Sequence, residues 1–215
     1  MRIFMDTANI DDIRRGAALG VVDGITTNPS LLAKEGVQYR DRVLEICSVV
    51  DGPISAECIS TELEPLLAEA RRIAAWHENV VVKIAMGEVG LQAIRQLASE
   101  NIKVNTTLIF SANQALLAAK AGAAYVSPFI GRLNDAGQDG MDVVRESVRI
   151  FDHFGLPTEV LAASVRGLRD VTECALAGAH VATLPPAVLF GMMQHPLTDK
   201  GIEIFLRDAQ KYTAV

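Results

Sequence analysis

The stretch Val80-Val81-Val82-Lys83-Ile84-Ala85-Met86 guides the interpretation of this 215-residue chain. It is a short, almost continuous apolar run, which is typical of a strand buried on both faces. Strands of this kind belong to parallel sheets that are covered by helices. Its single lysine is unusual, because burying an ammonium group is costly. Lys83 could still lie at a strand end with its amine in solvent.

Seven other apolar runs alternate with longer segments that have a helical period. The candidate strands begin near Ile3, Gly24, Ile54, Val80, Ile102, Tyr125, Glu159 and Val181. Strict alternation of eight strands with eight helices implies the α/β class and a parallel sheet. At this length the closed (β/α)8 TIM barrel is the expected fold. An open doubly wound sheet is the alternative, but no G-x-G-x-x-G motif follows the first strand.

A last apolar stripe follows the eighth unit, at Ile202, Phe205, Leu206 and Ala209. It predicts an additional C-terminal helix over about 199–212. Because no barrel strand remains for its apolar face, this helix could pack on its own barrel or on a neighbouring subunit. No linker or change of composition divides the chain, so we expect a single barrel domain over residues 1–215.

Composition excludes several classes of function. The net charge of −6 argues against non-specific binding to nucleic acids or anionic membranes. No apolar run approaches the ~20 residues of a membrane span, and charge follows the N-terminus too soon for a signal peptide. Three scattered cysteines indicate reduced thiols and a cytoplasmic location. No cluster has metal-ligand spacing, and the four histidines fall at helix ends or in loops.

Polar residues gather where the predicted strands end, which is where chemistry lies in such barrels. Asp6 could merely cap the first helix, and Arg132 could pair with Asp135 at the surface. Together, however, these residues would bring two carboxylates, one lysine and two arginines to one mouth. The set comprises Asp6, Thr26, Thr27, Asn28, Glu57, Lys83, Thr106, Thr107, Ser127 and Ser164, with Arg132 and Arg166 just beyond the sixth and seventh strands.

These residue types indicate Schiff-base chemistry. Burial disfavours the charged form of the Lys83 amine, and a neutral amine can attack a ketose carbonyl. The resulting iminium withdraws electrons, so the adjacent C–C bond can break once Asp6 or Glu57 removes a hydroxyl proton. Asn28 could bond substrate hydroxyls in either direction. The two arginines, with Ser164, could hold a terminal phosphate.

The same residues carry a family resemblance that covers essentially the whole chain. The chain resembles the transaldolases of the small, single-barrel kind, close to the fructose-6-phosphate aldolases. The most specific segments are Thr26-Thr27-Asn28-Pro29-Ser30 and Ser127-Pro128-Phe129-Ile130-Gly131-Arg132. They are supported by Phe4-Met5-Asp6-Thr7-Ala8, Val81-Val82-Lys83-Ile84, Thr107-Leu108-Ile109-Phe110-Ser111 and Leu161-Ala162-Ala163-Ser164.

The resemblance implies a role for each residue. Lys83 would form the Schiff base, Asp6 would be the acid/base of C–C cleavage, and Glu57 would act through a water held with Thr107. The expected substrate-binding residues are Thr26, Asn28, Ser127, Phe129, Arg132, Ser164 and Arg166, with Arg132, Ser164 and Arg166 on the phosphate. No metal or organic cofactor is implied.

The implied reaction converts sedoheptulose 7-phosphate and glyceraldehyde 3-phosphate into erythrose 4-phosphate and fructose 6-phosphate, a step of the pentose phosphate pathway. The implied assembly is a homodecamer of two stacked pentamers, in which the C-terminal helix reaches a neighbouring subunit. Asn134 departs from the family pattern, which has an aspartate there, and this puts the support of Arg132 in question.

Two alternatives to the transaldolase reaction remain at the level of the sequence. A fructose-6-phosphate aldolase is one, although the aldolases that resemble this chain carry glutamine at the position of Glu57 and tyrosine at that of Phe129. The other is a non-catalytic sugar-phosphate-binding protein with the same fold. The complete set of Asp6, Glu57 and Lys83 favours an enzyme.

Overall fold

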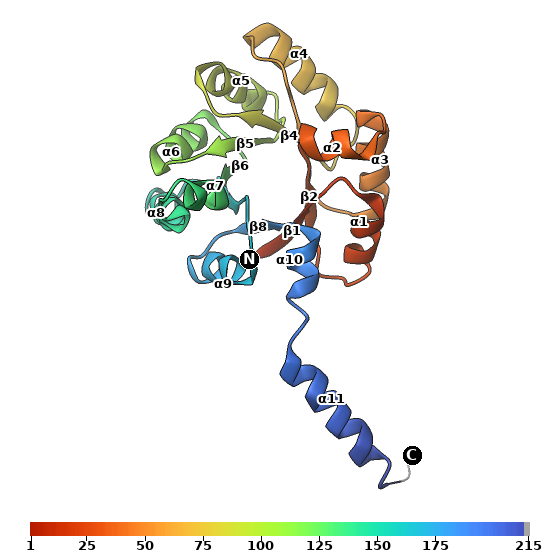
Figure 1. Ribbon diagram of the computed structural model, residues 1–215. Coiled ribbons are helices and arrows are strands. Elements are labelled where there is room, and N and C mark those ends of the chain that lie inside the picture. Colours follow the sequence, from red (N-terminus) through yellow and green to blue (C-terminus); the bar gives the residue numbers. More distant parts are fainter. Residues whose placement is uncertain (213–215) are drawn as a thin grey trace.

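The computed structural model describes residues 1–212, and its eight strands close into one barrel in sequence order (Figure 1). Every neighbouring pair is parallel, and β1 pairs with both β2 and β8, which confirms the (β/α)8 fold. The strands are β1 (Arg2–Asp6), β2 (Gly24–Thr26), β3 (Ile54–Glu57), β4 (Val80–Ala85), β5 (Val104–Ile109), β6 (Tyr125–Pro128), β7 (Glu159–Ala162) and β8 (Val181–Leu184).

Most predicted strand starts agree with the structure to within one residue, but β5 begins at Val104 instead of near Ile102. The backbone N–H of Ile102 donates to the Leu97 carbonyl at 3.0 Å, and Asn101 adopts a left-handed conformation at φ 60°. These residues therefore close the preceding helix before the chain enters the sheet.

All helices except the last surround the barrel, as Figure 1 shows. They are α1 (Ile10–Ala17), α2 (Pro29–Glu35), α3 (Tyr39–Val49), α4 (Leu63–Ala74), α5 (Glu88–Ser99), α6 (Ala112–Ala121), α7 (Ile130–Asp135), α8 (Gly140–Phe154), α9 (Leu168–Leu176), α10 (Pro186–Gly191) and α11 (Pro196–Ala209). The prediction of one helix per strand missed the short α2 and α7, which follow β2 and β6. Both short helices matter below, because Asn28 caps α2 and Arg132 lies on α7.

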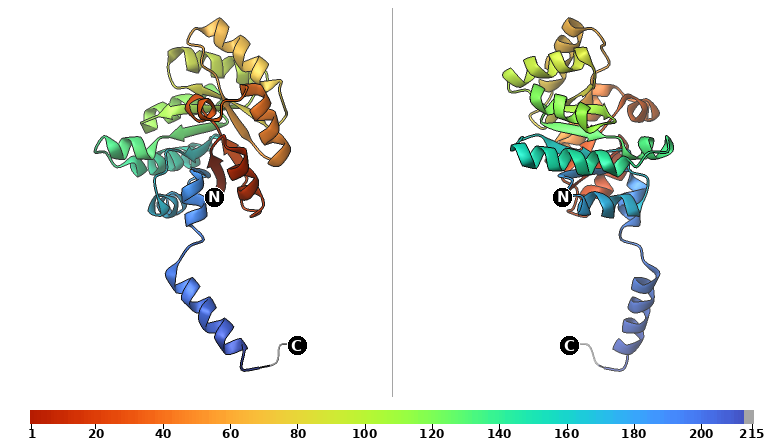
Figure 2. Two further views of the ribbon diagram at one scale, coloured as in Figure 1. Left: turned by 45° about the vertical axis from the view of Figure 1, so that its right-hand side comes forward. Right: turned by 90° about the vertical axis from the view of Figure 1, so that its left-hand side faces the viewer.

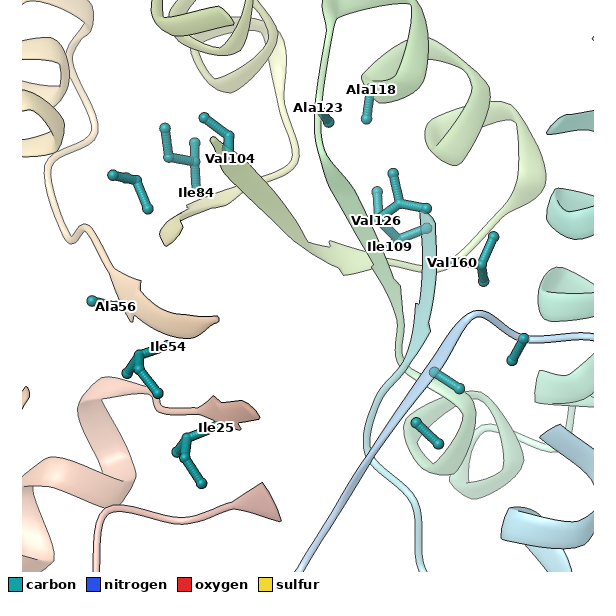
Figure 3. Close-up of a cluster of buried hydrophobic side chains, with 14 of the residues drawn as sticks. Ile25, Ile54, Ala56, Ile84, Val104, Ile109, Ala118, Ala123, Val126 and Val160 are labelled. Atoms are coloured by element: carbon teal, nitrogen blue, oxygen red, sulfur yellow. The ribbon is translucent and has the colours of Figure 1, made fainter. Parts of the chain in front are cut away.

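The main hydrophobic core lies between the strands and the surrounding helices (Figure 3). Strand residues such as Ile25, Ile84 and Val126 are buried there, together with Ala118 of α6. Because alternate residues of a strand face opposite sides of the sheet, the remaining residues point into the barrel. The outer core thus fixes the strand register that places the interior side chains.

The barrel interior has an apolar level below a polar one. The apolar level, which we call the floor, consists of Phe4, Val81, Tyr125, Leu161 and Val181, all buried. Two residues further along four of these strands come Asp6, Lys83, Ser127 and Thr183, which form part of the polar mouth. Gly24 leaves room for the floor, because a Cβ there would lie 2.8 Å from the Phe4 ring.

Helix α11 extends away from the barrel, and Figures 1 and 2 show this from three directions. None of its residues is buried, and the side chain of Phe205 is 75% exposed. Ile202 and Leu206 are exposed as well. The helix therefore packs on nothing within the described chain. No helix in residues 1–212 has the length and apolar character needed to cross a bilayer.

Candidate active site

A cavity of about 200 Å³ opens at the carboxyl ends of the strands. Glu57 and Thr107 do not line it, although Glu57 contacts Lys83 from behind. The other predicted site residues all lie on its wall, namely Asp6, Thr26, Asn28, Lys83, Ser127, Phe129, Arg132, Ser164 and Arg166. They come from β1, β2, β4, β6, α7 and the loops after β2, β6 and β7, so only barrel closure brings them together.

Lys83 lies inside the barrel with 5% of its surface exposed, so its amine does not reach bulk solvent. Its Nζ is 2.9 Å from Glu57 Oε2 and donates to the Thr27 carbonyl at 3.1 Å. The register of β3 and β4 places Glu57 beside Lys83. A carboxylate at this distance stabilises the ammonium and can also accept its proton, which would leave a neutral nucleophile.

Asp6 ends β1 and faces the cavity beside Thr26 of β2. The Thr26 hydroxyl donates to Asp6 Oδ1 at 2.7 Å. Burial raises the pKa of Asp6, although the Thr26 hydrogen bond and the charge of Lys83 act in the opposite direction. A carboxyl group with a raised pKa is suited to exchanging protons with a substrate. Asp6 does not cap α1, because the side chain of Asn9 accepts hydrogen bonds from the first N–H groups of that helix.

Ser127 is held by a buried polar network below the cavity. Its hydroxyl donates to Asn105 Oδ1 at 2.7 Å, and Asn105 Nδ2 donates to Ser55 Oγ at 3.1 Å. All three side chains are buried. Because the Ser127 hydrogen is used by Asn105, the Ser127 oxygen can face the cavity as an acceptor.

Asn28 has a structural task besides its place on the cavity wall. Its Oδ1 accepts from the Leu31 N–H at 3.0 Å and so caps α2. One of the two acceptor positions of this oxygen is therefore already used, which limits how far Asn28 can accept hydrogen bonds from substrate hydroxyls. Asn28 can offer a ligand its amide nitrogen as a donor and the second lone pair of its oxygen as an acceptor.

Arg132 lies on α7, where its guanidinium stands 4.9 Å above the centroid of the Phe129 ring. Phe129 in turn meets Phe110 edge-on at 5.9 Å. Among residues 1–212, Arg132 makes no ion pair within 4.0 Å, and it lines the cavity. Asn134 accepts a hydrogen bond from the Gly140 N–H at 2.9 Å and serves the start of α8.

Arg166, not Arg132, pairs with Asp135, at 3.0 Å, so the ion pair considered from the sequence involves the other arginine. The backbone of α7 packs closely against Ser164 and Arg166 here. A Cβ at Gly131 would lie 2.1 Å from the Ser164 carbonyl oxygen and 2.6 Å from Arg166 Nε. Ser164 itself has φ 60°, a strained conformation of the kind that clusters at functional sites.

Thr107 contributes a buried hydroxyl that lacks a hydrogen-bond partner within the described residues. Such groups usually bind water or ligand, because an unsatisfied buried hydroxyl is costly. The β5 register shifts between Thr106 and Ile109, beside Thr107. Glu57 lines a separate hollow of about 250 Å³ with Tyr39 and Ile59.

Polar residues of the barrel interior that sequence reasoning missed include Asn105, Thr183 and Ser55. Asn105 supports Ser127, whereas Thr183 lines the cavity and lies 2.7 Å from the Thr26 hydroxyl. A signal was present for Asn105 and Thr183, because both are polar residues inside predicted strands: Asn105 comes two residues before Thr107, and Thr183 two residues after Val181 of the floor.

Other reactive groups lie outside the site. The three cysteines are free and buried, and burial raises the pKa of Cys58 and that of Cys174 to about 12, so both thiols stay protonated. His195 caps α11, and no histidine lines the cavity in the described part of the chain. Residues 1–212 hold no group of three or more His, Cys, Asp or Glu side chains placed to bind a metal ion.

Comparison with known proteins agrees with this geometry. The family model described as transaldolase/fructose-6-phosphate aldolase matches residues 3–214. The chain belongs to this family. It is 59% identical over 208 residues to a protein from Heliobacterium modesticaldum, covering 97% of each chain. It is also 56% identical over 211 residues to one from Herpetosiphon aurantiacus, covering 98% of this chain and 96% of the other. Both relatives are named probable transaldolase, and the family is one of enzymes.

Solved structures of other sequences share the fold. A lactate oxidase from Pediococcus acidilactici superposes with a TM-score of 0.60 at 16% identity, over 88% of this chain and 64% of that one. A soluble mutant of the membrane-associated (S)-mandelate dehydrogenase from Pseudomonas putida gives 0.63 at 14% identity, over 89% and 68%. At these identities the likeness concerns the barrel alone.

Proposed function

We propose that this family member is a transaldolase that moves a dihydroxyacetone unit between sugar phosphates. The reaction takes sedoheptulose 7-phosphate and glyceraldehyde 3-phosphate to erythrose 4-phosphate and fructose 6-phosphate, in the pentose phosphate pathway. The observation that carries this proposal is the buried Lys83–Glu57 pair beside Asp6, in a cavity rimmed by two arginines. The buried free thiols support a cytoplasmic location as part of the proposal.

The first step is attack on the ketose carbonyl. Glu57 accepts a proton from the Lys83 ammonium across 2.9 Å, and the neutral Nζ adds to C2 of the substrate. The C–O bond of the carbinolamine then breaks, and the oxygen leaves as water with a proton returned by Glu57. The unpartnered Thr107 hydroxyl supports a place for that water.

The second step is C–C cleavage. The Asp6 carboxylate removes the proton of the C4 hydroxyl, the C3–C4 bond breaks, and its electron pair moves into the iminium as an enamine. The aldehyde product leaves, and the three-carbon unit stays on Lys83. An acceptor aldehyde then reacts by the reverse sequence, with Asp6 returning its proton.

The phosphate lies at the rim in this proposal, held by Arg132, Arg166 and Ser164. Guanidinium groups bind phosphate through two parallel hydrogen bonds, and both arginines project from elements that follow the strand ends. Asn28, Thr26 and Ser127 contact the sugar hydroxyls.

A product assay tests the reaction against its family alternative. Fructose 6-phosphate is supplied with and without erythrose 4-phosphate, and release of glyceraldehyde 3-phosphate is followed. We expect rapid turnover only with the acceptor, because Phe129 has no hydroxyl that could protonate the waiting enamine. Equal rates with and without acceptor would make the protein a fructose-6-phosphate aldolase. The double variant Glu57→Gln, Phe129→Tyr should raise the acceptor-free rate.

The exposed helix α11 supports a homo-oligomer, with a decamer of two pentamers as the expected form. Its apolar residues Ile202, Phe205 and Leu206 have no partner in the described chain, and a neighbouring subunit would cover them. Ending the chain at Gln194 should lower the mass measured by light scattering well beyond the loss of the segment. An unchanged number of subunits would contradict this assembly.

A further inference from the structure

The mouth contains a chain of hydroxyl groups that ends on Asp6. Thr183 Oγ1 lies 2.7 Å from Thr26 Oγ1, and Thr26 Oγ1 lies 2.7 Å from Asp6 Oδ1. Both threonines are only 2% exposed, so little water reaches these bonds even though both residues line the cavity. The barrel register creates the chain, since β1 lies between β2 and β8 with Asp6 beside Thr26 and Phe4 beside Thr183.

The direction of the hydrogen bonds follows from the number of hydrogens. A carboxylate only accepts, so the single hydroxyl hydrogen of Thr26 points to Asp6 Oδ1. The short contact between the threonines then needs the hydrogen of Thr183. Donation by Thr183 thus prevents Thr26 from turning its hydrogen away from Asp6. It also keeps Oδ1 an acceptor, which leaves Oδ2 to exchange the proton with substrate.

We propose that Thr183 is a positioning residue, which acts through Thr26 to orient the Asp6 carboxylate for proton transfer. This inference deepens the proposed function and rests on it. In a Thr183→Val variant, Thr26 can instead accept a proton placed on Oδ1. Its donation to the carboxylate also weakens, because linked hydrogen bonds strengthen one another by roughly 10–30%. Both changes favour the protonated acid.

Other charges that face Asp6 remain the same in this variant. Lys83 on β4 lies close enough to lower the pKa of Asp6, and Glu57 acts on it through Lys83. Arg132 on α7 and Arg166 after β7 line the same cavity. No histidine, cysteine or tyrosine lines it among residues 1–212.

The test compares Thr183→Val with Thr183→Ser, which keeps the hydroxyl. Thr158→Val is the matched control, because Thr158 is equally buried and donates to the Ala123 carbonyl at 2.7 Å, outside the cavity. We measure kcat and KM against pH with fructose 6-phosphate and erythrose 4-phosphate. Borohydride trapping of the imine is measured in parallel, and thermal unfolding verifies that each variant is folded.

For Thr183→Val we expect kcat to fall roughly two- to tenfold. The acidic limb should move up by a few tenths of a pH unit while KM and imine trapping stay unchanged, since Lys83 is untouched. Thr183→Ser should restore both readouts, and Thr158→Val should match wild type. An unshifted acidic limb in Thr183→Val, or equal loss in Thr158→Val, would overturn the inference alone. Wild-type protein that neither traps an imine nor turns over would overturn the proposed function, and this inference with it.

Discussion

The same strands build the floor and the mouth of the barrel, yet the charged groups below the floor and those at the mouth differ in how they are paired. Along β1, Phe4 of the floor is followed two residues later by Asp6, and along β4 Val81 is followed by Lys83. Beneath the floor, Arg2 pairs with Glu159 and stacks 5.7 Å from the centroid of the Phe4 ring. At this end, the charged side chains of Arg2 and Glu159 therefore neutralise each other.

At the mouth, several charges have no equal partner within the described chain. Arg132 has only the face of Phe129 beneath it, and Asp6 has hydroxyl support but no ion pair within 4.0 Å. Asp6 is partly buried without a full partner, which is costly, and such groups are retained where a ligand completes them, whereas Arg132 is exposed and open to a ligand. The difference between the ends therefore separates residues that hold the barrel from residues that act on substrate.

The largest expected effect is that of replacing Lys83, and it is compared with a change at Val81, two residues earlier on β4. Lys83→Arg should abolish turnover and borohydride trapping, because a guanidinium stays protonated and forms no imine. Val81→Ala should retain both while losing roughly 1–3 kcal/mol of stability to a floor cavity. Activity assays, adduct mapping and denaturant unfolding measure these outcomes. An adduct at another lysine, or an active Lys83→Arg protein, would remove Lys83 from its proposed role.

The alternation of strand residues between the barrel interior and the outer core also explains how far the sequence could predict the site. Eight apolar runs with polar ends predicted the barrel and the residues of its mouth, because strand ends in a closed barrel share one rim. The sequence could not predict the register of β1 with β2 and β8, which brings Thr183 to Thr26 across 157 positions. The Arg166–Asp135 pair also depends on the short helix α7, which ends at Asp135, and on the loop after β7, and no periodicity specifies either.

The next effect distinguishes the two arginines of the mouth from the arginines of the surface. Arg132→Ala and Arg166→Ala should each raise KM for fructose 6-phosphate roughly 10- to 150-fold, the equivalent of 1.5–3 kcal/mol for a charged hydrogen bond. KM for unphosphorylated fructose should change little. Arg169→Ala is the control, since its side chain is 89% exposed and, among residues 1–212, pairs with Glu173 alone. Equal losses on both sugars would argue against phosphate binding.

A smaller effect is expected at the opposite end. Arg2→Gln removes the pair with Glu159 and the ring contacts, which are partly exposed to solvent. We expect a loss of about 1 kcal/mol and a Tm lower by roughly 2–4 °C, with unchanged kinetics. Arg14→Gln breaks a more exposed pair, with Glu45 at 3.0 Å, and should leave Tm almost unchanged. A kinetic defect in Arg2→Gln would show that the two ends are coupled.

The smallest effect concerns the one ion pair at the rim, Arg166 with Asp135. Asp135 and the substrate phosphate compete for the same guanidinium, and the pair is well exposed, so it is worth roughly 0.2–1 kcal/mol. Asp135→Asn should therefore lower KM for fructose 6-phosphate by about 1.5- to 5-fold at low salt, with kcat unchanged. The advantage should shrink as salt screens the rim. Glu173→Gln removes the same charge from α9 without freeing Arg166 and should leave KM unchanged. A higher KM in Asp135→Asn would mean that the carboxylate holds Arg166 in its phosphate-binding position, and the rim would then resemble the paired end of the barrel.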